Sequence, residues 1–211
     1  MYHTFIFDLD GTIIDSETIG LEALQAALKE IGINKTLEEL RFSIGIPGLR
    51  TLEILEIGDI PTALHSWLEK QKPFMENVPI FPGITEVLEQ LPNLAIVTSQ
   101  NRKELQAGFK KLRIAPYFKT VVCADDTEKH KPNPDPLLFA LQLLKIKKHE
   151  AIYIGDSIYD MRCAKAAGVE FGVAAWGLTS TSKFIEADYI FETPNDILRL
   201  KADNTPTSYI I

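Results

Sequence analysis

The sequence predicts an α/β protein built on a doubly wound parallel sheet, with a small all-α domain inserted after the first strand. Short apolar runs recur along the chain, and from residue 94 onward they alternate with helical patterns. Strands that alternate with helices form crossover units, which place parallel strands in one sheet. Residues 16–79 interrupt this rhythm, because they contain helical patterns and no convincing strand.

The expected strands are short and strongly apolar, as buried parallel strands are. They are Phe5–Phe7, Leu94–Val97, Val121–Cys123, Ile152–Ile154, Phe171–Ala174 and Tyr189–Phe191. The clearest helical patterns between them are Lys103–Leu112, Pro136–Leu144 and Tyr159–Ala167. We assign residues 1–15 and 80–211 to this core domain. The tail after Leu200 matches no pattern.

Residues 16–79 are expected to form the inserted helical domain. One apolar face repeats at helical spacing and consists of Leu21, Leu24, Leu28 and Ile31. A second helix is expected to begin at Thr36, because Glu39 is placed for a capping box. A third is expected to begin near Pro61 and to carry Leu64 and Leu68 inward.

The junctions of the insert, near Asp15 and Pro79, are the expected hinges of a mobile lid over the carboxyl ends of the strands. Glycine and proline at residues 45, 47 and 48 predict a loop between helices of the insert. A helical subdomain that only packs against the sheet is the alternative.

Composition limits the function classes. The chain of 211 residues can bury a sizeable core, and its two cysteines, Cys123 and Cys163, are expected to be small buried residues. A net charge of −7 argues against a nucleic-acid partner, which needs a basic face. Asp8 and Asp10 interrupt the only early apolar run, so we expect no signal peptide, and no run approaches the ~18 residues of a membrane span. We expect a cytoplasmic monomer or homodimer.

Two carboxylates follow the first strand. One residue separates Asp8 from Asp10, and Gly11 and Thr12 follow. Open α/β sheets bind their ligands at the carboxyl ends of the strands, and like charges this close are costly unless a cation or protons offset them. This pattern favours a divalent-metal site, and an acidic turn that closes the strand is the alternative.

Two later segments carry groups suited to phosphate. Thr98 and Ser99 follow the second strand at an expected helix start, where hydroxyl and N–H groups can bind phosphate oxygens. An ordinary helix N-cap is the alternative. Lys131 lies among prolines and could neutralise both a nucleophilic carboxylate and a bound phosphate. A solvated lysine before a helix is the alternative.

The strand Ile152–Ile154 also leads to acids. Asp156 follows it, and Asp160 comes four residues later, where it can turn back toward the strand end within the first helical turn. Asp156 would be a further oxygen ligand for a hard cation with few protein ligands, which is typical of Mg²⁺. A helix N-cap with a nearby acid is the alternative.

The order and spacing of these segments resemble the haloacid dehalogenase superfamily of phosphotransferases. Four segments of this chain resemble the four motifs of that superfamily, in order. They are Asp8-Leu9-Asp10-Gly11-Thr12, Thr98-Ser99, Lys131 and Gly155-Asp156-Ser157-Ile158-Tyr159-Asp160. The resemblance spans Phe5 to about Gly177, and the helical insert matches the cap of the family in position and size.

The resemblance implies a role for each matching residue. Asp8 would be the nucleophile that becomes an aspartyl-phosphate, and Asp10 the general acid and then base. Thr98 would hold the phosphoryl group, and Lys131 would orient both Asp8 and that group. Mg²⁺ would be bound by Asp8, Asp156 and the backbone carbonyl of Asp10, with Asp160 supporting the metal. An acid two residues beyond the nucleophile separates phosphoryl transfer from dehalogenation.

Within the superfamily, the sequence is most similar to the phosphoglycolate phosphatase and β-phosphoglucomutase group. The segment from Ile44 to Thr51 occupies the place of that group's substrate-recognition loop. Arg50 could therefore meet a carboxylate or second phosphate of the substrate, and an exposed helix arginine is the alternative.

The sequence thus predicts a Mg²⁺-dependent phosphatase that acts on a small phosphorylated metabolite, such as a phosphoglycolate-like acid or a sugar phosphate. A sugar-phosphate mutase would use the same residues. A non-enzymatic receiver domain also places acids at the ends of parallel strands, but the helical insert and Asp10 argue against it.

Overall fold

The computed structural model describes residues 2–75, 77–109 and 112–201, so residues 202–211 of the C-terminal tail lie outside the described part. Its centre is a six-stranded sheet with the order β3-β2-β1-β4-β5-β6, and every neighbouring pair is parallel. The strands are β1 (Thr4–Phe7), β2 (Leu94–Val97), β3 (Phe118–Val122), β4 (Ala151–Gly155), β5 (Glu170–Ala174) and β6 (Tyr189–Phe191). The predicted parallel α/β sheet is confirmed.

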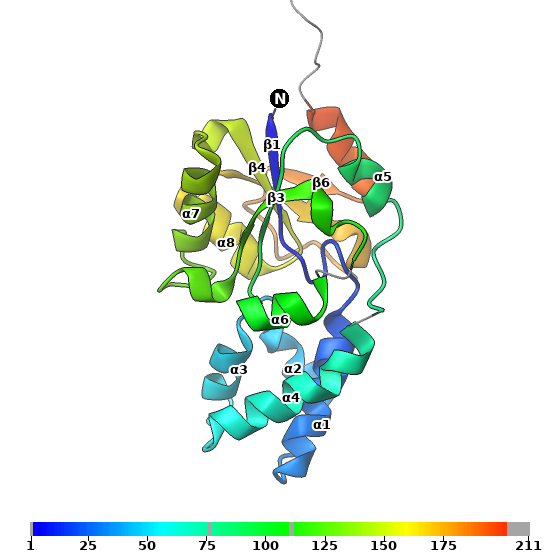
Figure 1. The fold of residues 1–211 in the computed structure, drawn as a ribbon, viewed down its shortest axis with the longest axis vertical. Coiled ribbons are helices and arrows are strands. Elements are labelled where there is room, and N and C mark those ends of the chain that lie inside the picture. The colour runs from blue at the N-terminus through cyan, green and yellow to red at the C-terminus, as the bar shows by residue number, and fades with distance from the viewer. Residues whose placement is uncertain (1, 76, 110–111, 202–211) are drawn as a thin grey trace, which may run out of the picture.

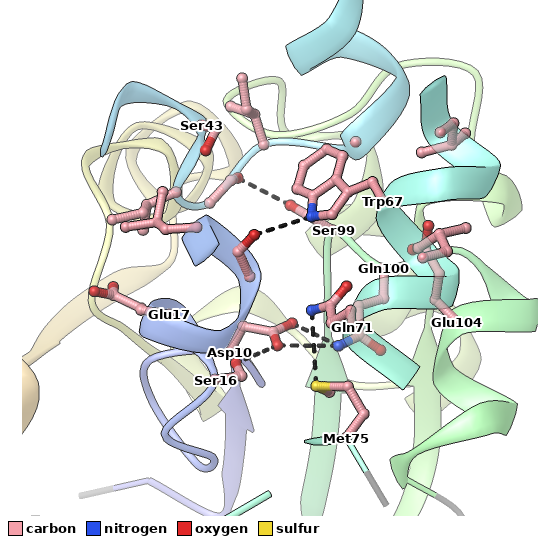
Figure 2. Close-up of a pocket in the computed structure, with 18 of the residues that line it drawn as sticks. Asp10, Ser16, Glu17, Ser43, Trp67, Gln71, Met75, Ser99, Gln100 and Glu104 are labelled. Carbon is pink, nitrogen blue, oxygen red and sulfur yellow. Dashed lines mark hydrogen bonds between the residues drawn. The ribbon is translucent and has the colours of Figure 1, made fainter. Parts of the chain in front are cut away.

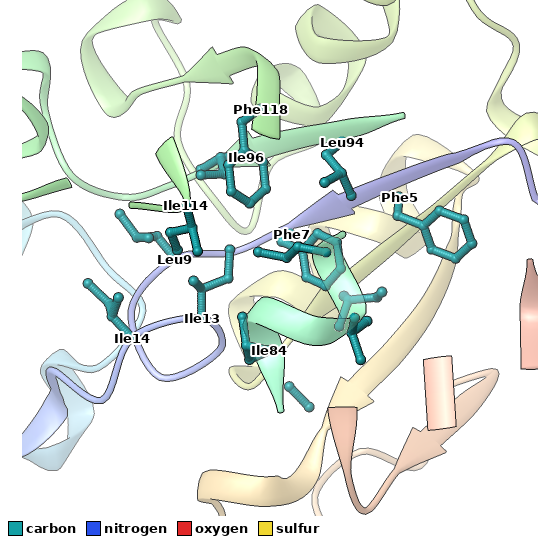
Figure 3. Packing of buried hydrophobic residues seen from close by; sticks show 14 of the residues in the cluster. Phe5, Phe7, Leu9, Ile13, Ile14, Ile84, Leu94, Ile96, Ile114 and Phe118 are labelled. Carbon is teal, nitrogen blue, oxygen red and sulfur yellow. The ribbon is translucent and has the colours of Figure 1, made fainter. Parts of the chain in front are cut away.

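Successive side chains of the central strand β1 point to opposite faces of the sheet. Phe5 and Phe7 belong to one buried cluster, and Ile6 belongs to the other. Figure 3 shows Phe5 and Phe7 packed near Leu94, Ile96 and Ile84. Because each face of the sheet is apolar, each is covered by helices, which makes the sheet doubly wound.

The helices of the core are α5 (Ile84–Leu88), α6 (Arg102–Ala107), α7 (Asp135–Leu144) and α8 (Ile158–Ala167). Short 3₁₀ segments connect the elements over Ala115–Tyr117, Ala124–Asp126, Lys148–Glu150, Ala175–Gly177 and Pro194–Leu200. Helices α5 and α6 and the last 3₁₀ segment contribute to the cluster of Phe5, whereas α7 and α8 contribute to the cluster of Ile6. Cys123 and Cys163 are buried, as predicted.

The inserted helices form a second lobe, below the sheet in Figure 1. They are α1 (Glu17–Glu30), α2 (Leu37–Leu40), α3 (Gly48–Ile54) and α4 (Ile60–Met75), with a 3₁₀ turn at Arg41–Ser43. They have a hydrophobic cluster of their own, which includes Leu24, Leu28 and Trp67. The expected capping box is present, because Thr36 accepts a hydrogen bond from the backbone of Glu39 and the Glu39 side chain accepts one from Thr36. An all-α insert is therefore confirmed.

Several expected details of the helices differ from the structure. Ile31 is 45% exposed rather than part of the apolar face, because α1 ends at Glu30 and Gly32 takes a left-handed conformation. Helix α6 ends at Ala107, where Gly108 packs against Met75 of the insert. Leu64 and Leu68 are only half-buried, while Ala63 and Trp67 fill the inner face of α4.

The two chain crossings between the lobes run side by side. The backbone N–H of Asp15 donates to the carbonyl of Pro79 at 2.8 Å, and the N–H of Phe81 donates to Ile13 at 3.0 Å. These are the junctions that the sequence predicted as hinges. Among the described residues, no helix is both long enough and apolar enough to cross a membrane.

Candidate active site

The carboxyl ends of three adjacent strands bring the predicted polar residues together. Asp8 follows β1, Thr98 follows β2 and Asp156 follows β4, and the exposed fraction of each residue is at most 3%. The ladder continues through these positions, because the N–H of Asp8 donates to Ile154 at 2.8 Å and that of Thr98 donates to Val122 at 3.0 Å. Regular strand pairing therefore fixes the backbone positions from which these side chains extend.

Lys131 is buried at the centre of this group, in the segment that precedes α7. Its ammonium donates to Asp160 Oδ1 at 2.7 Å, to Asp8 Oδ1 at 2.9 Å and to the Tyr153 hydroxyl at 3.2 Å. Burial by itself lowers the pKa of Lys131, but Asp160 and Asp8 outweigh it and raise that pKa above its ordinary value. Lys131 therefore stays protonated beside Asp8, the predicted nucleophile.

Asp160 is fully buried and held from several sides. Ser157 caps α8, and its backbone N–H and hydroxyl donate to Asp160 Oδ2 at 3.1 and 2.5 Å. The Tyr153 hydroxyl donates to Asp160 Oδ1 at 2.8 Å. A Cβ at Gly155 would lie 2.7 Å from Asp160 Cβ, so the strand can end this close to Asp160 only with glycine there.

Carboxylate oxygens of Asp8, Asp156 and Asp160 all lie within 4.8 Å of one another. Three carboxylates beside one ammonium leave an excess of two negative charges, and burial together with this mutual repulsion raises the pKa values of Asp8 and Asp156. A divalent cation would offset that excess. An all-oxygen donor set suits a hard ion such as Mg²⁺.

The hydrogen bonds between described residues show which of these oxygens are available to a cation. Both oxygens of Asp160 already accept hydrogen bonds. Asp8 accepts through Oδ1 from Lys131, and Asp156 accepts through Oδ1 from the Thr12 hydroxyl at 2.7 Å, so the second oxygen of each is available. Gly11 has φ +78°, and a Cβ there would lie 2.7 Å from Asp156 Cγ. Gly11 and Thr12 thus shape the position of Asp156.

Asp10 lies outside this carboxylate group. Its Oδ1 accepts from the Ser16 hydroxyl at 2.5 Å, and the Gln100 amide donates to its two oxygens at 3.0 and 2.8 Å, as Figure 2 shows. Burial raises the pKa of Asp10 despite these hydrogen bonds. The Asp10 side chain is therefore not among the grouped carboxylates, and the sequence-based expectation of a metal contact through its backbone carbonyl remains a prediction.

A cavity of about 310 Å³ lies between the two lobes, and both Asp8 and Asp10 line it. The insert contributes residues of α1 and α4 and the loop from Ser43 to Gly48, and the core contributes Ser99, Gln100 and the start of α6. Figure 2 shows Trp67 and Gln71 of α4 across the cavity from Asp10. A small molecule in this cavity would touch both lobes.

Two predicted binding residues have other contacts in this structure. The Ser99 hydroxyl donates to the Gly45 carbonyl of the insert at 2.9 Å, so its proton is used in joining the lobes. Arg50 does not line the cavity, in contrast to the expectation that it meets the substrate. It lies on the outer side of α3, where its side chain is 62% exposed and pairs with Glu53 at 2.8 Å. The seven-residue helix α3 turns Arg50 away from the core.

Sequence reasoning missed Tyr153 and Gln100, and also Ser16, whose hydroxyl donates to Asp10. Tyr153 contacts Lys131 and Asp160, but a tyrosine within an apolar strand gives no signal that separates it from the core. Gln100 holds Asp10, and it follows Thr98-Ser99 in the same predicted loop. A polar residue next to a phosphate motif is the signal that could have identified it.

Comparisons with known proteins show the family and the fold of this chain. A family model described as haloacid dehalogenase-like hydrolase matches residues 5–174. Pyrophosphatase PpaX of Oceanobacillus iheyensis is 29% identical, over 95% of this chain and 97% of that protein.

Solved structures are similar over nearly the whole chain. One from Lactobacillus plantarum, provisionally named a phosphoglycolate phosphatase, is 31% identical with a TM-score of 0.87, over 95% of this chain and 99% of the other. One from Thermotoga maritima, provisionally named a β-phosphoglucomutase, is 27% identical with a TM-score of 0.73, over 95% and 98%. The chain therefore belongs to the haloacid dehalogenase-like hydrolases, as an enzyme of the phosphatase type.

Proposed function

We propose that this protein is a Mg²⁺-dependent phosphatase that hydrolyses small phosphorylated metabolites through an aspartyl-phosphate on Asp8. The contact between Asp8 and Lys131 carries the proposal, because a buried carboxylate paired with a lysine lines the cavity between the lobes. Asp10 lines the same cavity two residues further along the chain. These residues supply a nucleophile, a cation and a proton carrier in one site.

In the first step, an oxygen of Asp8 attacks phosphorus and the bond from phosphorus to the leaving oxygen breaks. Asp10 gives its proton to that oxygen, and the raised pKa of Asp10 supports this role, because burial favours its protonated form. Lys131 orients Asp8 and reduces its repulsion of the phosphoryl group. The Thr98 hydroxyl accepts from the N–H of Gln100 at 3.1 Å and keeps its own proton for a phosphoryl oxygen.

In the second step, Asp10, now ionised, takes a proton from water. The water oxygen attacks phosphorus, the bond to Asp8 breaks, and inorganic phosphate leaves. Asp10 ends protonated and Asp8 ends as a carboxylate, so the cycle closes. Mg²⁺ held by Asp8 and Asp156 would neutralise charge on the transferring group.

Pyrophosphate is a second candidate substrate, because the similar protein from Oceanobacillus iheyensis is named a pyrophosphatase. A sugar-phosphate mutase is supported by the likeness to the Thermotoga maritima structure. A mutase must hold a second phosphate during turnover, and the described residues along the cavity include no arginine for that purpose. We therefore place hydrolysis first.

The direct test is release of inorganic phosphate from acetyl phosphate and p-nitrophenyl phosphate, with and without Mg²⁺. We expect turnover with Mg²⁺ and near-complete loss with a chelator, because the carboxylate group then keeps its uncompensated charge. A receiver-type phospho-acceptor would give at most one phosphate per chain. Equal turnover with and without a divalent cation would contradict the proposal.

We also propose that residues 16–79 act as a lid that closes over the site. Gly45 supports this role, because it has φ +82° and a Cβ there would lie 2.7 Å from the Cβ and Oγ of Ser157 in the core. Gly45 also accepts the hydrogen bond from Ser99. The lobes can approach this closely only while residue 45 has no side chain.

Gly45→Ala is expected to lower kcat/KM by roughly 10- to 10²-fold, because the added methyl holds the lid away from its closed position. Gly32→Ala is the matched control, since Gly32 lies in the same lobe with φ +80° and no atom of the described residues lies within 4 Å of an added Cβ. Both variants carry the strain of a left-handed alanine, ~1–2 kcal/mol. Steady-state kinetics and melting curves of the two compare them. Equal kinetic losses in the two would contradict the steric role of Gly45.

A further inference from the structure

We propose that the leaving group of the substrate is uncharged and largely apolar, of about the size of a single ring. This inference rests on the proposed phosphatase function and defines the substrate class of the same site. It separates phosphate monoesters that have a neutral leaving group from pyrophosphate, phosphoglycolate and sugar bisphosphates. The cavity wall that faces the proposed catalytic carboxylates supports this assignment.

The insert supplies an apolar wall to the cavity. Leu64, Trp67, Leu68 and Met75 line it from α4, and Ile46 lines it from the loop before α3. The indole N–H of Trp67 donates to the Gly20 carbonyl at 3.0 Å, so the polar edge of the ring is already paired. The wall therefore offers carbon surface to the part of a substrate that extends beyond the phosphoryl group.

The charges along the cavity repel an anionic leaving group. Beyond the proposed machinery, the acidic lining residues are Glu17, Glu69 and Glu104. The cations that line it from the described part of the chain are Lys72 and Lys103, both exposed, and Lys72 lies 3.4 Å from Glu69. The deeper wall thus has no cation among the described residues.

Glu104 adds to this effect on the core side. It is half-buried, and burial raises its pKa to about 7, with Asp10 and Asp125 contributing in the same direction. Near neutral pH this side chain is either an anion, which repels a carboxylate or phosphate of a substrate, or a neutral acid, which offers one hydrogen-bond donor and no positive charge. An anion buried against this wall would lose its hydration, and beyond the proposed machinery the described lining residues include no buried cation to compensate.

The size of the cavity limits the leaving group as well. At about 310 Å³ it lies at the lower end of the range of ligand sites, and the phosphoryl group occupies the part next to Asp8. The remaining space suits one ring or a short carbon chain.

The test compares two substrates of similar shape whose ring substituents differ in charge, 4-carboxyphenyl phosphate and its methyl ester, together with pyrophosphate and phosphoglycolate. With Mg²⁺ present, we expect kcat/KM for the methyl ester to exceed that for the carboxylate by about tenfold or more. Pyrophosphate and phosphoglycolate are expected to be poorer substrates than the methyl ester. Acetyl phosphate serves as the small reference substrate.

A pair of variants distinguishes the effect of the cavity wall on kcat/KM from the intrinsic reactivity of the two phosphate esters. Leu68→Lys places a cation in the wall, and we expect it to shift the ratio of the two kcat/KM values by about tenfold toward the carboxylate. Leu49→Lys is the control, because Leu49 is 52% exposed on α3 and does not line the cavity. The control should leave the ratio unchanged.

Each outcome has one meaning. A preference for the methyl ester that Leu68→Lys reverses, and Leu49→Lys does not, would support the inference. Equal or better turnover of the carboxylate, pyrophosphate or phosphoglycolate would overturn it while leaving the phosphatase proposal intact. Absence of Mg²⁺-dependent phosphate release from every substrate, including acetyl phosphate, would overturn the phosphatase proposal and the inference together.

Discussion

Replacing Asp8 with asparagine is expected to lower phosphatase turnover by about 10⁴-fold or more, because an amide cannot form the covalent intermediate. The side chains have nearly the same shape, and Asp8 is buried at the end of β1, so the fold should persist. Loss of its negative charge also removes the ionic partner of Lys131 at 2.9 Å. Single-turnover and steady-state phosphate release measure the effect, with circular dichroism to confirm folding.

Asp15→Asn is the matched control for Asp8→Asn. Asp15 lies in the same N-terminal segment, but it is exposed and does not line the cavity. The control should keep wild-type turnover. If Asp8→Asn retained more than a small fraction of wild-type turnover while Asp15→Asn behaved normally, Asp8 would not be the nucleophile.

The second large effect concerns the metal. Asp156→Ala is expected to abolish activity or to raise the Mg²⁺ concentration needed for half-maximal rate steeply, because the cation loses one of two carboxylates with an available oxygen. Thr12→Val should give an intermediate increase, since it removes only the hydrogen bond that orients Asp156 at 2.7 Å. Mg²⁺ titrations of the rate and Mg²⁺-binding calorimetry measure both.

Asp10→Asn provides the contrast to Asp156→Ala. Asp10 lies outside the carboxylate group, so its replacement should leave Mg²⁺ affinity close to wild type. Turnover should fall by ~10²–10⁴-fold, because proton transfer to the leaving oxygen is lost. An equal loss of Mg²⁺ affinity in both variants would contradict this division between metal binding and proton transfer.

Much of the fold was predictable because local pattern and burial agree. Five strands lie within one residue of their expected bounds, since each contains a continuous apolar run. The exception is β3, expected at Val121–Cys123 and observed at Phe118–Val122. It is an edge strand of the sheet, and its Lys119 and Thr120 face partly outward, so its first half lacks the apolar signal.

The central part of the site was predictable for a different reason. Asp8, Thr98 and Asp156 directly follow strands, and parallel pairing fixes where strands end relative to one another. Lys131 lies outside the strands, so the local pattern left a solvated lysine open as the alternative, and the family resemblance favoured its place among the acids. Its contact with Tyr153 depends on which face of β4 the ring occupies, which no local pattern reveals.

The wall supplied by the insert was the least predictable part. Gly48 begins the short helix α3 where a loop was expected, and α3 determines that Arg50 points outward. Leu64 and Leu68 read as core residues, but they line the cavity instead. The orientation of a short helix depends on tertiary packing, so sequence patterns could not give the substrate contacts.

The most direct test of the account is to trap the phosphoryl group on the enzyme. Asp10→Asn, which should form the intermediate but hydrolyse it slowly, is mixed with acetyl phosphate and Mg²⁺, quenched in acid and digested. We expect one phosphoryl group per chain, located by mass spectrometry on the peptide that contains Asp8. Turnover without phosphorylation of Asp8, or phosphorylation at another residue, would contradict it.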